Sequence, residues 1–422
     1  MEQLLHYIWK HRIFPLKQLV TTAGISVEVI DPGLNNSNAG PDFFNAKIRI
    51  NGTLWVGNVE IHSKASDWYR HGHDQNKVYD SVILHVAREV DCEVKRTSGE
   101  LIPQMQLSCP EHIKMNYQEL HKADMLPPCY KIIPDLSSFT IHSWLSVLQS
   151  ERFEHKSEAI HARLKHCNGS WEDAFFITLA RNFGFGLNGD AFEKWAGLIP
   201  LRSVDKHRDS LFKVEAIFFG QAGLLEEPLD DPYYKMLKKE FAYLKHLFQL
   251  PVMDPSLWHF LRLRPGNFPH VRIAQLAYLY STKWGLFSRV MGASSIKQIK
   301  EVLSTSVSDY WEEHYQFYSP SPRRSKHLSE STYNLLIINT VVPFLYAYGR
   351  HKIDDDLCQR AGNLLEEIKA EDNYVTRMWN GVGLNVNNAA DSQALLELKK
   401  EYCDKKKCLY CRIGFEYLKQ QK

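Results

Sequence analysis

The spacing of apolar residues divides the chain into two parts near residue 125. In the first ten residues, Leu4, Leu5, Ile8 and Trp9 fall on one side of a helix. Short runs rich in β-branched and aromatic residues follow, separated by turn sequences such as Asn51-Gly52, a pair typical of tight hairpins. The pattern predicts a helix, a strand, a hairpin, a short helix and a further strand, with strands at residues 27–30, 44–50, 53–62 and 82–87.

A helical spacing of apolar residues dominates from about Pro134 onward. We therefore predict an α/β (α+β) domain over residues 1–125 and a larger all-α domain over residues 126–422. The segment Met125-Leu126-Pro127-Pro128-Cys129 is the best candidate for a linker. The clearest helical segments are residues 144–164, 171–183, 234–248, 273–279 and 392–402.

Composition changes this picture only slightly. The chain has 422 residues, of which 44% are hydrophobic and 24% charged, which is ordinary for a globular protein. Its formal net charge of +2 excludes a strong overall field, so nucleic acid would have to bind at a local basic patch. The first residues lack the basic segment of a secretory signal, and the longest apolar run, residues 335–348, is shorter than the roughly 20 residues of a membrane span. We expect a cytoplasmic protein without a membrane segment, whose cysteines are reduced.

The unusual feature is histidine, which occurs 19 times. Four histidines, His62, His71, His73 and His85, fall close together in the first part of the chain. His85 lies inside the apolar strand, where a hydrogen-bonded core histidine is the simpler interpretation. His71 and His73 flank Gly72, and a glycine permits the irregular backbone that two such neighbours need to reach one ion. One interpretation is a zinc site formed by His62, His71, His73 and Asp67.

Two acidic residues flank the turn of the predicted hairpin, one before its first strand and one near the end of its second strand. Gly40-Pro41-Asp42 precedes it, and Glu60-Ile61-His62-Ser63-Lys64 ends it. Alternation along a strand places Glu60, His62 and Lys64 on one face. An Asp at the start of one strand and a Glu on its partner is the arrangement by which metal-dependent nucleases hold Mg²⁺ through oxygen ligands.

These residues resemble the PD-(D/E)XK nuclease superfamily, whose core has the order αβββαβ and whose motif is Pro-Asp, a hairpin and Glu-x-Lys. The resemblance implies a restriction-endonuclease-like fold for the N-terminal domain, with Asp42 and Glu60 as ligands of Mg²⁺ or Mn²⁺. His62 occupies the lysine position of the motif. Either His62 or Lys64 would therefore act on the attacking water, and the sequence leaves both open.

Three further strings are similar to an uncharacterised bacterial family, domain of unknown function 2851. They are Asn38-Ala39-Gly40-Pro41-Asp42, Val59-Glu60-Ile61-His62 and His71-Gly72-His73-Asp74, and a fourth similar string is Ser66-Asp67-Trp68. This similarity extends along the whole chain, and it implies no activity.

Register provides an internal test of the metal site. A regular two-residue turn at Asn51-Gly52 would place Asp42 opposite Ile61 and so on the face away from Glu60. A site formed by both acids therefore requires a bulge, a longer loop or a strand break at Pro41, and we predict one of these. The simpler alternative is that Asp42 is a turn residue and that Glu60 is an exposed acid paired with Lys47 or Arg49.

The segment after the hairpin, residues 66–74, is predicted to be a loop that contacts substrate. An aromatic side chain there would stack on a base, and basic side chains would bind phosphate. The simpler alternative is a solvated loop in which Asp74 caps the next short helix. The candidate substrate-binding residues are Asp67, Trp68, Arg70, His71 and His73.

Three cysteines near the C-terminus, Cys403, Cys408 and Cys411, form a second candidate metal site. Closely spaced thiols hold zinc or an iron-sulfur cluster when a fourth ligand comes from elsewhere. If the preceding helix continues through them, they are instead buried neighbours on a packed helix face.

Residues 184–189 fit the dinucleotide-binding pattern G-x-G-x-x-G. A helical segment precedes them where the dinucleotide-binding fold needs a strand, so we predict a loop between helices.

The leading hypothesis is metal-dependent hydrolysis of phosphodiester bonds in DNA or RNA. The alternative is a binding module that keeps the fold and contacts nucleic acid or protein without catalysis. Metal ligands that converge on one point would favour the enzyme hypothesis. Carboxylates that point away from each other would favour the binding module.

Overall fold

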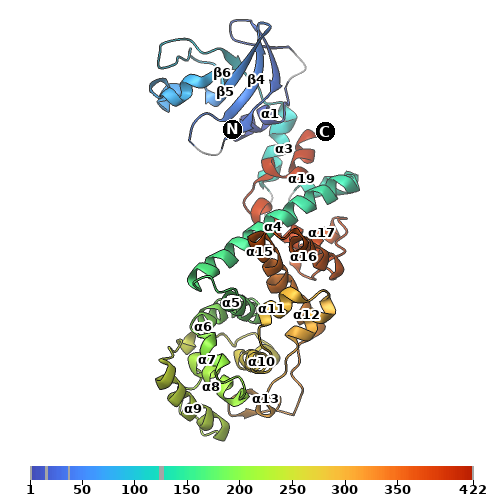
Figure 1. Ribbon diagram of the computed structural model, residues 1–422. Coiled ribbons are helices and arrows are strands. Elements are labelled where there is room, and N and C mark those ends of the chain that lie inside the picture. The colour runs from blue at the N-terminus through green and yellow to red at the C-terminus, as the bar shows by residue number, and fades with distance from the viewer. Residues whose placement is uncertain (1, 15–17, 37–38, 123–127, 421–422) are drawn as a thin grey trace. The chain divides into compact units, whose positions relative to one another are not determined.

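A computed structural model describes residues 2–14, 18–36, 39–122 and 128–420, which divide into two compact units (Figure 1). The sheet unit comprises residues 1–141, 381–384 and 398–422, and the helical unit comprises residues 142–380 and 385–397. The helical unit is therefore an insertion in the chain of the sheet unit. The predicted boundary near residue 125 and most of the predicted linker lie at residues 123–127, outside the described residues.

A mixed sheet forms the larger part of the sheet unit. Strands β2 (Ser26–Asp31), β4 (Phe43–Ile50) and β5 (Thr53–Lys64) are antiparallel neighbours, and β6 (Val82–Glu89) runs parallel to β5. These are the four predicted strands, and their predicted ends are correct to within two residues. Three short strands complete the sheet: β1 (Leu19–Val20), β3 (Leu34–Asn35) and β7 (Gln104–Gln106).

The first helix, α1 (Glu2–Lys10), packs against β5. Its predicted apolar side is confirmed, because Leu4, Leu5, Ile8 and Trp9 are all buried. The indole N–H of Trp9 donates to the backbone oxygen of Pro32 at 3.0 Å, which joins the helix to the turn after β2. An apolar stripe with one directed hydrogen bond thus fixes α1 on the sheet.

The predicted hairpin between β4 and β5 is also confirmed. Asn51 and Gly52 both have positive φ angles, 49° and 79°, and Ile50 pairs with Thr53. Positive φ at both central residues is the signature of the turn that matches the twist of antiparallel strands.

The segment between β5 and β6 is more ordered than a loop. Residues Asp67–Arg70 form one helical turn, α2, and two 3₁₀ turns follow, η1 (His73–Gln75) and η2 (Lys77–Ser81). Asp74 lies inside η1, so its predicted role as a helix cap is wrong. Asn76 caps η2 instead, since its side chain accepts a hydrogen bond from the N–H of Val78 at 3.1 Å.

The C-terminal residues of the chain pack within the sheet unit. Helix α19 (Arg412–Lys419) lies against α3 (Glu111–Lys122) and the 3₁₀ segment η3 (Pro128–Asp135). The buried Asn116 of α3 donates from its amide to the backbone oxygens of Tyr417, Leu418 and Gln420 at 3.3, 3.3 and 3.0 Å. The ring of Phe415 lies 6.2 Å from that of Tyr7 in α1.

The helical unit surrounds one large aromatic and aliphatic core, and the mixed α+β class of the chain is confirmed. The predicted helices correspond to α4 (Ser138–His166), α5 (Trp171–Phe183), α9 (Pro232–Phe248), α10 (Pro269–Thr282) and α18 (Ala389–Glu397), the last continuing into a π-helical turn, η7 (Leu398–Cys403). Residues 184–189 join α5 to α6 (Gly189–Gly197), as predicted. The remaining helices are α7 (Leu201–Asp205), α8 (Leu211–Gln221), α11 (Leu286–Gly292), α12 (Ile296–Leu303), α13 (Asp309–Glu312), α14 (Glu330–Leu336), α15 (Val342–Lys352), α16 (Asp355–Glu367) and α17 (Tyr374–Gly381), with a small hairpin of β8 (His314–Gln316) and β9 (Ser319–Pro320).

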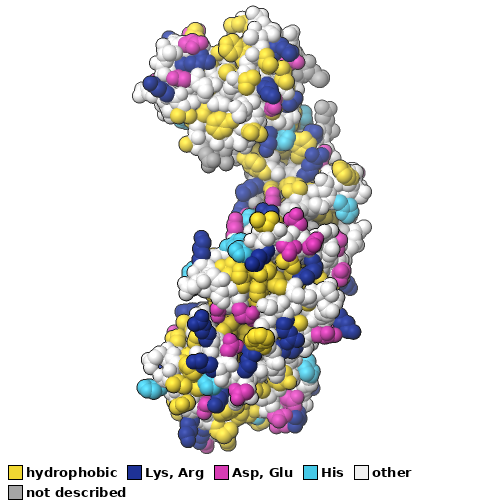
Figure 2. Space-filling model, in the orientation of Figure 1, with side chains coloured by type: hydrophobic (Ala, Val, Ile, Leu, Met, Phe, Trp, Pro, Cys, Tyr) yellow, Lys and Arg dark blue, Asp and Glu magenta, His cyan; other side chains and the backbone are white. Residues whose placement is uncertain are grey.

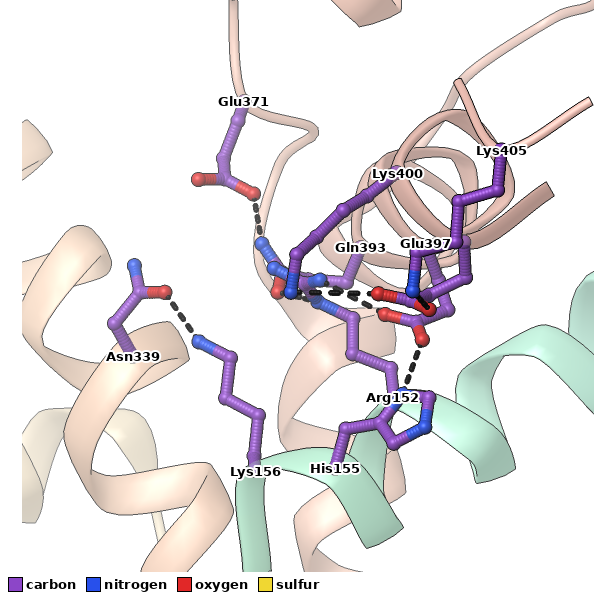
Figure 3. A network of polar contacts seen from close by, with 10 residues as sticks. Arg152, His155, Lys156, Asn339, Glu371, Gln393, Glu397, Lys400 and Lys405 are labelled. Carbon is purple, nitrogen blue, oxygen red and sulfur yellow. Dashed lines mark hydrogen bonds and ion pairs between the residues drawn. The ribbon is translucent and has the colours of Figure 1, made fainter. Parts of the chain in front are cut away.

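A buried polar network joins α4 to α18 (Figure 3). The carboxylate of Glu397, whose side chain is 2% exposed, lies 3.2 Å from Arg152 and 2.5 Å from His155. Arg152 also donates to the amide oxygen of Gln393 at 2.5 Å. The buried charge is therefore compensated by partners on the neighbouring helix, as such a charge requires.

Acidic and basic side chains are interspersed over the face of the molecule shown in Figure 2. This mixture agrees with the nearly neutral net charge. Among the described helices, none combines the length and apolar character needed to cross a membrane.

Candidate metal site

A bulge in β4 brings Asp42 beside Glu60. Residues 46–50 pair with residues 57–53 in the register of a two-residue turn, whereas Phe43 pairs with Val59, one position out of that register. Within the bulge Asn45 has a φ of 55°, a conformation that asparagine tolerates better than most residues. The predicted bulge is confirmed, and it removes the obstacle that a regular hairpin would have placed between the two acids.

Backbone groups hold the two carboxylates in place. The N–H of Asp42 donates to Oε2 of Glu60 at 3.0 Å, and the N–H of Ile61 donates to Oδ2 of Asp42 at 2.9 Å. Nε2 of His6, on α1, lies 3.3 Å from the same oxygen of Asp42. Burial lowers the pKa of His6, but the adjacent Asp42 carboxylate outweighs it and the pKa lies above its ordinary value.

Glu60 is a buried acid, with a residue exposure of 4%. Burial raises its pKa, as does the charge of Asp42, while the hydrogen bond with His73 opposes them. The alternative interpretation of Glu60 as an exposed acid paired with Lys47 or Arg49 is therefore wrong, and Arg49 pairs with Glu28 instead. A buried carboxylate of this kind needs a positive partner or a proton.

Two imidazoles contact this acid, and a third lies beside them. Oε1 of Glu60 lies 3.4 Å from Nε2 of His62 and 3.2 Å from Nε2 of His73. One ring nitrogen each from His62, His71 and His73 lie within 4.8 Å of one another, a spacing that can hold a metal ion. Gly72 makes this possible, because its φ of 73° turns the chain between the two histidines. His71 is exposed, so the group opens to solvent on that side.

His62 carries no charge at neutral pH. Burial, followed by the neighbouring His85, His73 and His71, lowers its pKa to about 3. Its Nδ1 lies 2.9 Å from Nε2 of the fully buried His85, so the predicted core role of His85 includes a direct contact with the site. A neutral imidazole whose other nitrogen has a hydrogen-bond partner is the usual form of a histidine metal ligand.

Aromatic side chains form the wall behind the imidazoles. The ring of His73 stacks on that of Tyr79 with 3.8 Å between centroids, and it meets the ring of Trp68 in a T-shaped contact with centroids 5.3 Å apart. Trp68 is completely buried and donates from its indole N–H to the backbone oxygen of Lys95 at 3.1 Å. Trp68 therefore supports the site from the core and does not present a surface for stacking a base.

The remaining predicted site residues lie outside the imidazole group. Asp67 accepts from the backbone N–H of Lys64 at 3.2 Å and pairs with Arg70 at 2.9 Å. Lys64 pairs with Glu89 on β6 at 3.4 Å, and its side chain is half exposed. The structure thus brings His62, His71 and His73 together, with Glu60 and Asp42 beside them, and Asp67 lies outside this group.

Sequence reasoning missed His6 and Tyr79. Both reach the site through tertiary contacts, one from α1 and the other from η2, and no local motif marks either residue. The only signal for His6 in the sequence is that it lies at the polar edge of a predicted amphipathic helix.

A family model described as "Protein of unknown function (DUF2851)" matches residues 2–374. No curated protein matches the chain, and no solved structure does.

Proposed function

The chain belongs to the DUF2851 family, whose description assigns no activity, and we therefore propose from the geometry of its site that it is a metal-dependent nuclease hydrolysing phosphodiester bonds of DNA or RNA. The observation that carries the proposal is the convergence of Glu60 with His62 and His73 beside Asp42. Nothing in the packing of a strand hairpin requires three imidazoles and two carboxylates at one place.

The donor set suits a transition metal. Imidazole nitrogens favour Zn²⁺ over Mg²⁺, which prefers oxygen ligands and bound water, and the two carboxylates also suit Mn²⁺. His62, His71 and His73, with Glu60, would hold the ion, and the exposed side of the group at His71 leaves room for water or substrate. A bound ion would supply a water of lowered pKa and neutralise charge on a phosphodiester.

The other residues would position these ligands. His85 would accept the Nδ1–H of His62 and so orient Nε2 toward the ion. The backbone N–H of Asp42 would orient Glu60 through Oε2, leaving Oε1 on the side of the imidazoles. The carboxylate of Asp42 stands beside this group as a second acid, and this pair is the feature shared with the motif of Mg²⁺-dependent nucleases.

The order of the elements supports a nuclease-like fold. After α1 come the antiparallel strands β2, β4 and β5, then the helical turn α2 and the parallel strand β6. With the short strands β1, β3 and β7 left out, this order resembles the order αβββαβ of the PD-(D/E)XK core. The lysine position of that motif is occupied by His62, which is neutral, and the ammonium group of Lys64 is engaged by Glu89. We therefore assign activation of the water to the metal.

Binding of nucleic acid would have to compete with ion pairs. Lys64 pairs with Glu89 and Arg70 with Asp67, so the basic side chains on either side of the site already have acidic partners. Phosphate contacts would replace these pairs, and we expect cleavage to weaken as salt concentration rises.

The proposal is tested by nicking of mixed DNA and RNA substrates in the presence of Mn²⁺, Zn²⁺ or Mg²⁺. We expect cleavage with Mn²⁺ or Zn²⁺, and a loss of about 100-fold or more in Glu60→Gln and His73→Gln, because even outer-shell partners of a metal contribute roughly 10- to 100-fold. Glu28→Gln is the matched control, since Glu28 is an exposed strand acid of the same sheet outside the site. Absence of cleavage by the wild type with all three metals, or equal cleavage by Glu60→Gln, would overturn the proposal in favour of a binding module.

A further inference from the structure

Helix α19 places two cations beside the end of α1 (Figure 1). Nζ of Lys419 lies 4.0 Å from the centre of the Phe415 ring, and the guanidinium carbon of Arg412 lies 5.2 Å from it. The same ring lies 4.6 Å from the ring of His11, which directly follows α1, and 6.2 Å from that of Tyr7. One aromatic side chain thus holds both cations of α19 next to the last turn of α1.

A turn in the cysteine segment sets the place where α19 begins. η7 ends at Cys403, and the chain continues through Lys406, which has a φ of 51°, into the 3₁₀ turn η8 (Cys408–Tyr410). The alternative of one helix running through the cysteines is therefore wrong. Of the side chains that the structure describes, only three imidazoles reach metal-ligand spacing, so the thiol metal site stays a prediction. Gly414 lets α19 approach the turn closely, because a Cβ there would lie 2.2 Å from the backbone oxygen of Cys408.

Lys10, the last residue of α1, connects these cations with the candidate metal site. It stands four residues after His6, and side chains at this spacing share a helix face, with their Cβ atoms about 6 Å apart. His6 itself contacts Asp42 at 3.3 Å. The exposed side chain of Lys10 therefore lies one helical turn from the acids of the site, and Lys10 directly precedes His11 in the chain.

Two of the three cations have no acidic partner, unlike the basic side chains next to the metal site. Arg412 pairs with Glu416 at 2.8 Å. Within the described part of the chain, no carboxylate stands at ion-pair distance from Lys10 or Lys419. An anion can therefore contact these two ammonium groups without first displacing an acid.

The ionisation of His11 reflects the surplus of positive charge. Burial, followed by the charges of Lys10, Lys419 and Arg412, lowers the pKa of His11 to about 4. His11 is therefore neutral at pH 7. Surroundings that disfavour a further cation in this way favour an anion.

We propose that Lys10, Arg412 and Lys419 form a phosphate-binding surface for the nucleic-acid strand that the candidate metal site cleaves. The inference rests on the proposed function, and it identifies the substrate as a polyanion that extends from the metal site along α1 onto α19. Because a nucleic acid carries a phosphate at every nucleotide, a strand held at the site brings further negative charge past Lys10. A local surface of this kind is also what a net charge of only +2 requires of a nucleic-acid-binding chain.

Binding measured without catalysis tests the surface. Fluorescence anisotropy of labelled single-stranded DNA, duplex DNA and RNA is recorded with the full chain in EDTA, over a range of salt concentrations. We expect the double variant Lys10→Gln/Lys419→Gln to bind more weakly. It should also flatten the slope of log affinity against log salt by about 1.4 for single strands and about 1.8 for duplexes, since each phosphate contact contributes roughly 0.7 or 0.9. Lys10→Arg/Lys419→Arg keeps both charges and should bind like the wild type.

The matched control is Lys239→Gln/Lys297→Gln, which removes the same charge from exposed positions of α9 and α12. An unchanged slope in Lys10→Gln/Lys419→Gln, an equal loss in the control, or equal competition by polyglutamate would overturn the surface. The nicking assay separates this failure from that of the proposed function. Cleavage that persists without any effect of the two lysines would overturn the surface alone, whereas lysine-dependent binding without cleavage would overturn the nuclease alone.

Discussion

Glu215, on α8, is a completely buried acid in the core of the helical unit. Tyr233 donates a hydrogen bond to its Oε2. Burial raises the pKa of Glu215 to about 7, although the hydrogen bond from Tyr233 opposes the shift. The folded chain therefore keeps a proton on this carboxyl that the unfolded chain, with the ordinary value near 4.5, has already lost.

This difference in protonation makes the free energy of unfolding depend on pH. Between pH 4.5 and 7 the folded state holds one more proton than the unfolded state, so the free energy of unfolding falls as pH rises, by up to about 1.4 kcal/mol per pH unit and about 3 kcal/mol in total. We expect Glu215→Gln to remove this part of the pH dependence in urea denaturation measured across that range. Glu366→Gln, at an exposed position of α16, should leave it in place; the same slope in Glu215→Gln and the wild type would contradict the assignment.

At the scale of elements, the bulge in β4 is the feature on which the candidate active site depends. Asn45 adopts its positive φ there, and its N–H donates to the side chain of Asn58 at 3.2 Å. We expect Asn45→Val to destabilise the bulge by about 1–2 kcal/mol, because a β-branched residue is strained in the left-handed region. Asn45→Gly relieves that strain and is the matched control.

The measurement for this prediction is the affinity for Mn²⁺ and Zn²⁺ together with the melting temperature. A slip of β4 into the regular register would turn Asp42 away from Glu60, so Asn45→Val should lose metal affinity as well as stability. A loss of stability with unchanged metal affinity would show that the metal site does not depend on the bulge.

The bulge also shows which parts of the structure could be predicted from the sequence and which could not. Alternation and the Asn51-Gly52 turn predict β4, β5 and their register, and the need to bring two acids together then predicts an irregularity in β4. Burial of both faces of β5 around Glu60 is not encoded locally, because α1 covers one face only in the folded chain.

For the whole molecule, the attachment of α19 to α3 is decisive for the sheet unit. Asn116 is buried, and its amide serves three backbone oxygens at the end of α19. We expect Asn116→Leu to cost about 1–3 kcal/mol, since those oxygens lose their donor in a buried place. A loss of this size corresponds to roughly tenfold to hundredfold faster hydrogen exchange in α19. The control is Gln118→Leu, at an exposed position of α3, which should leave the exchange rate of α19 unchanged. Equal exchange rates in the two variants would mean that aromatic packing around Phe415 holds the helix without Asn116.

The insertion of the helical unit has a consequence for synthesis on the ribosome. A nascent chain usually folds from its N-terminus onward as each domain emerges. Here the strands and α1 are made first, but α19 emerges only after all of the helical unit has been translated. The sheet unit, although it starts the chain, is therefore the last to be completed, and until then the faces of α1 and α3 that later contact α19 are available to chaperones.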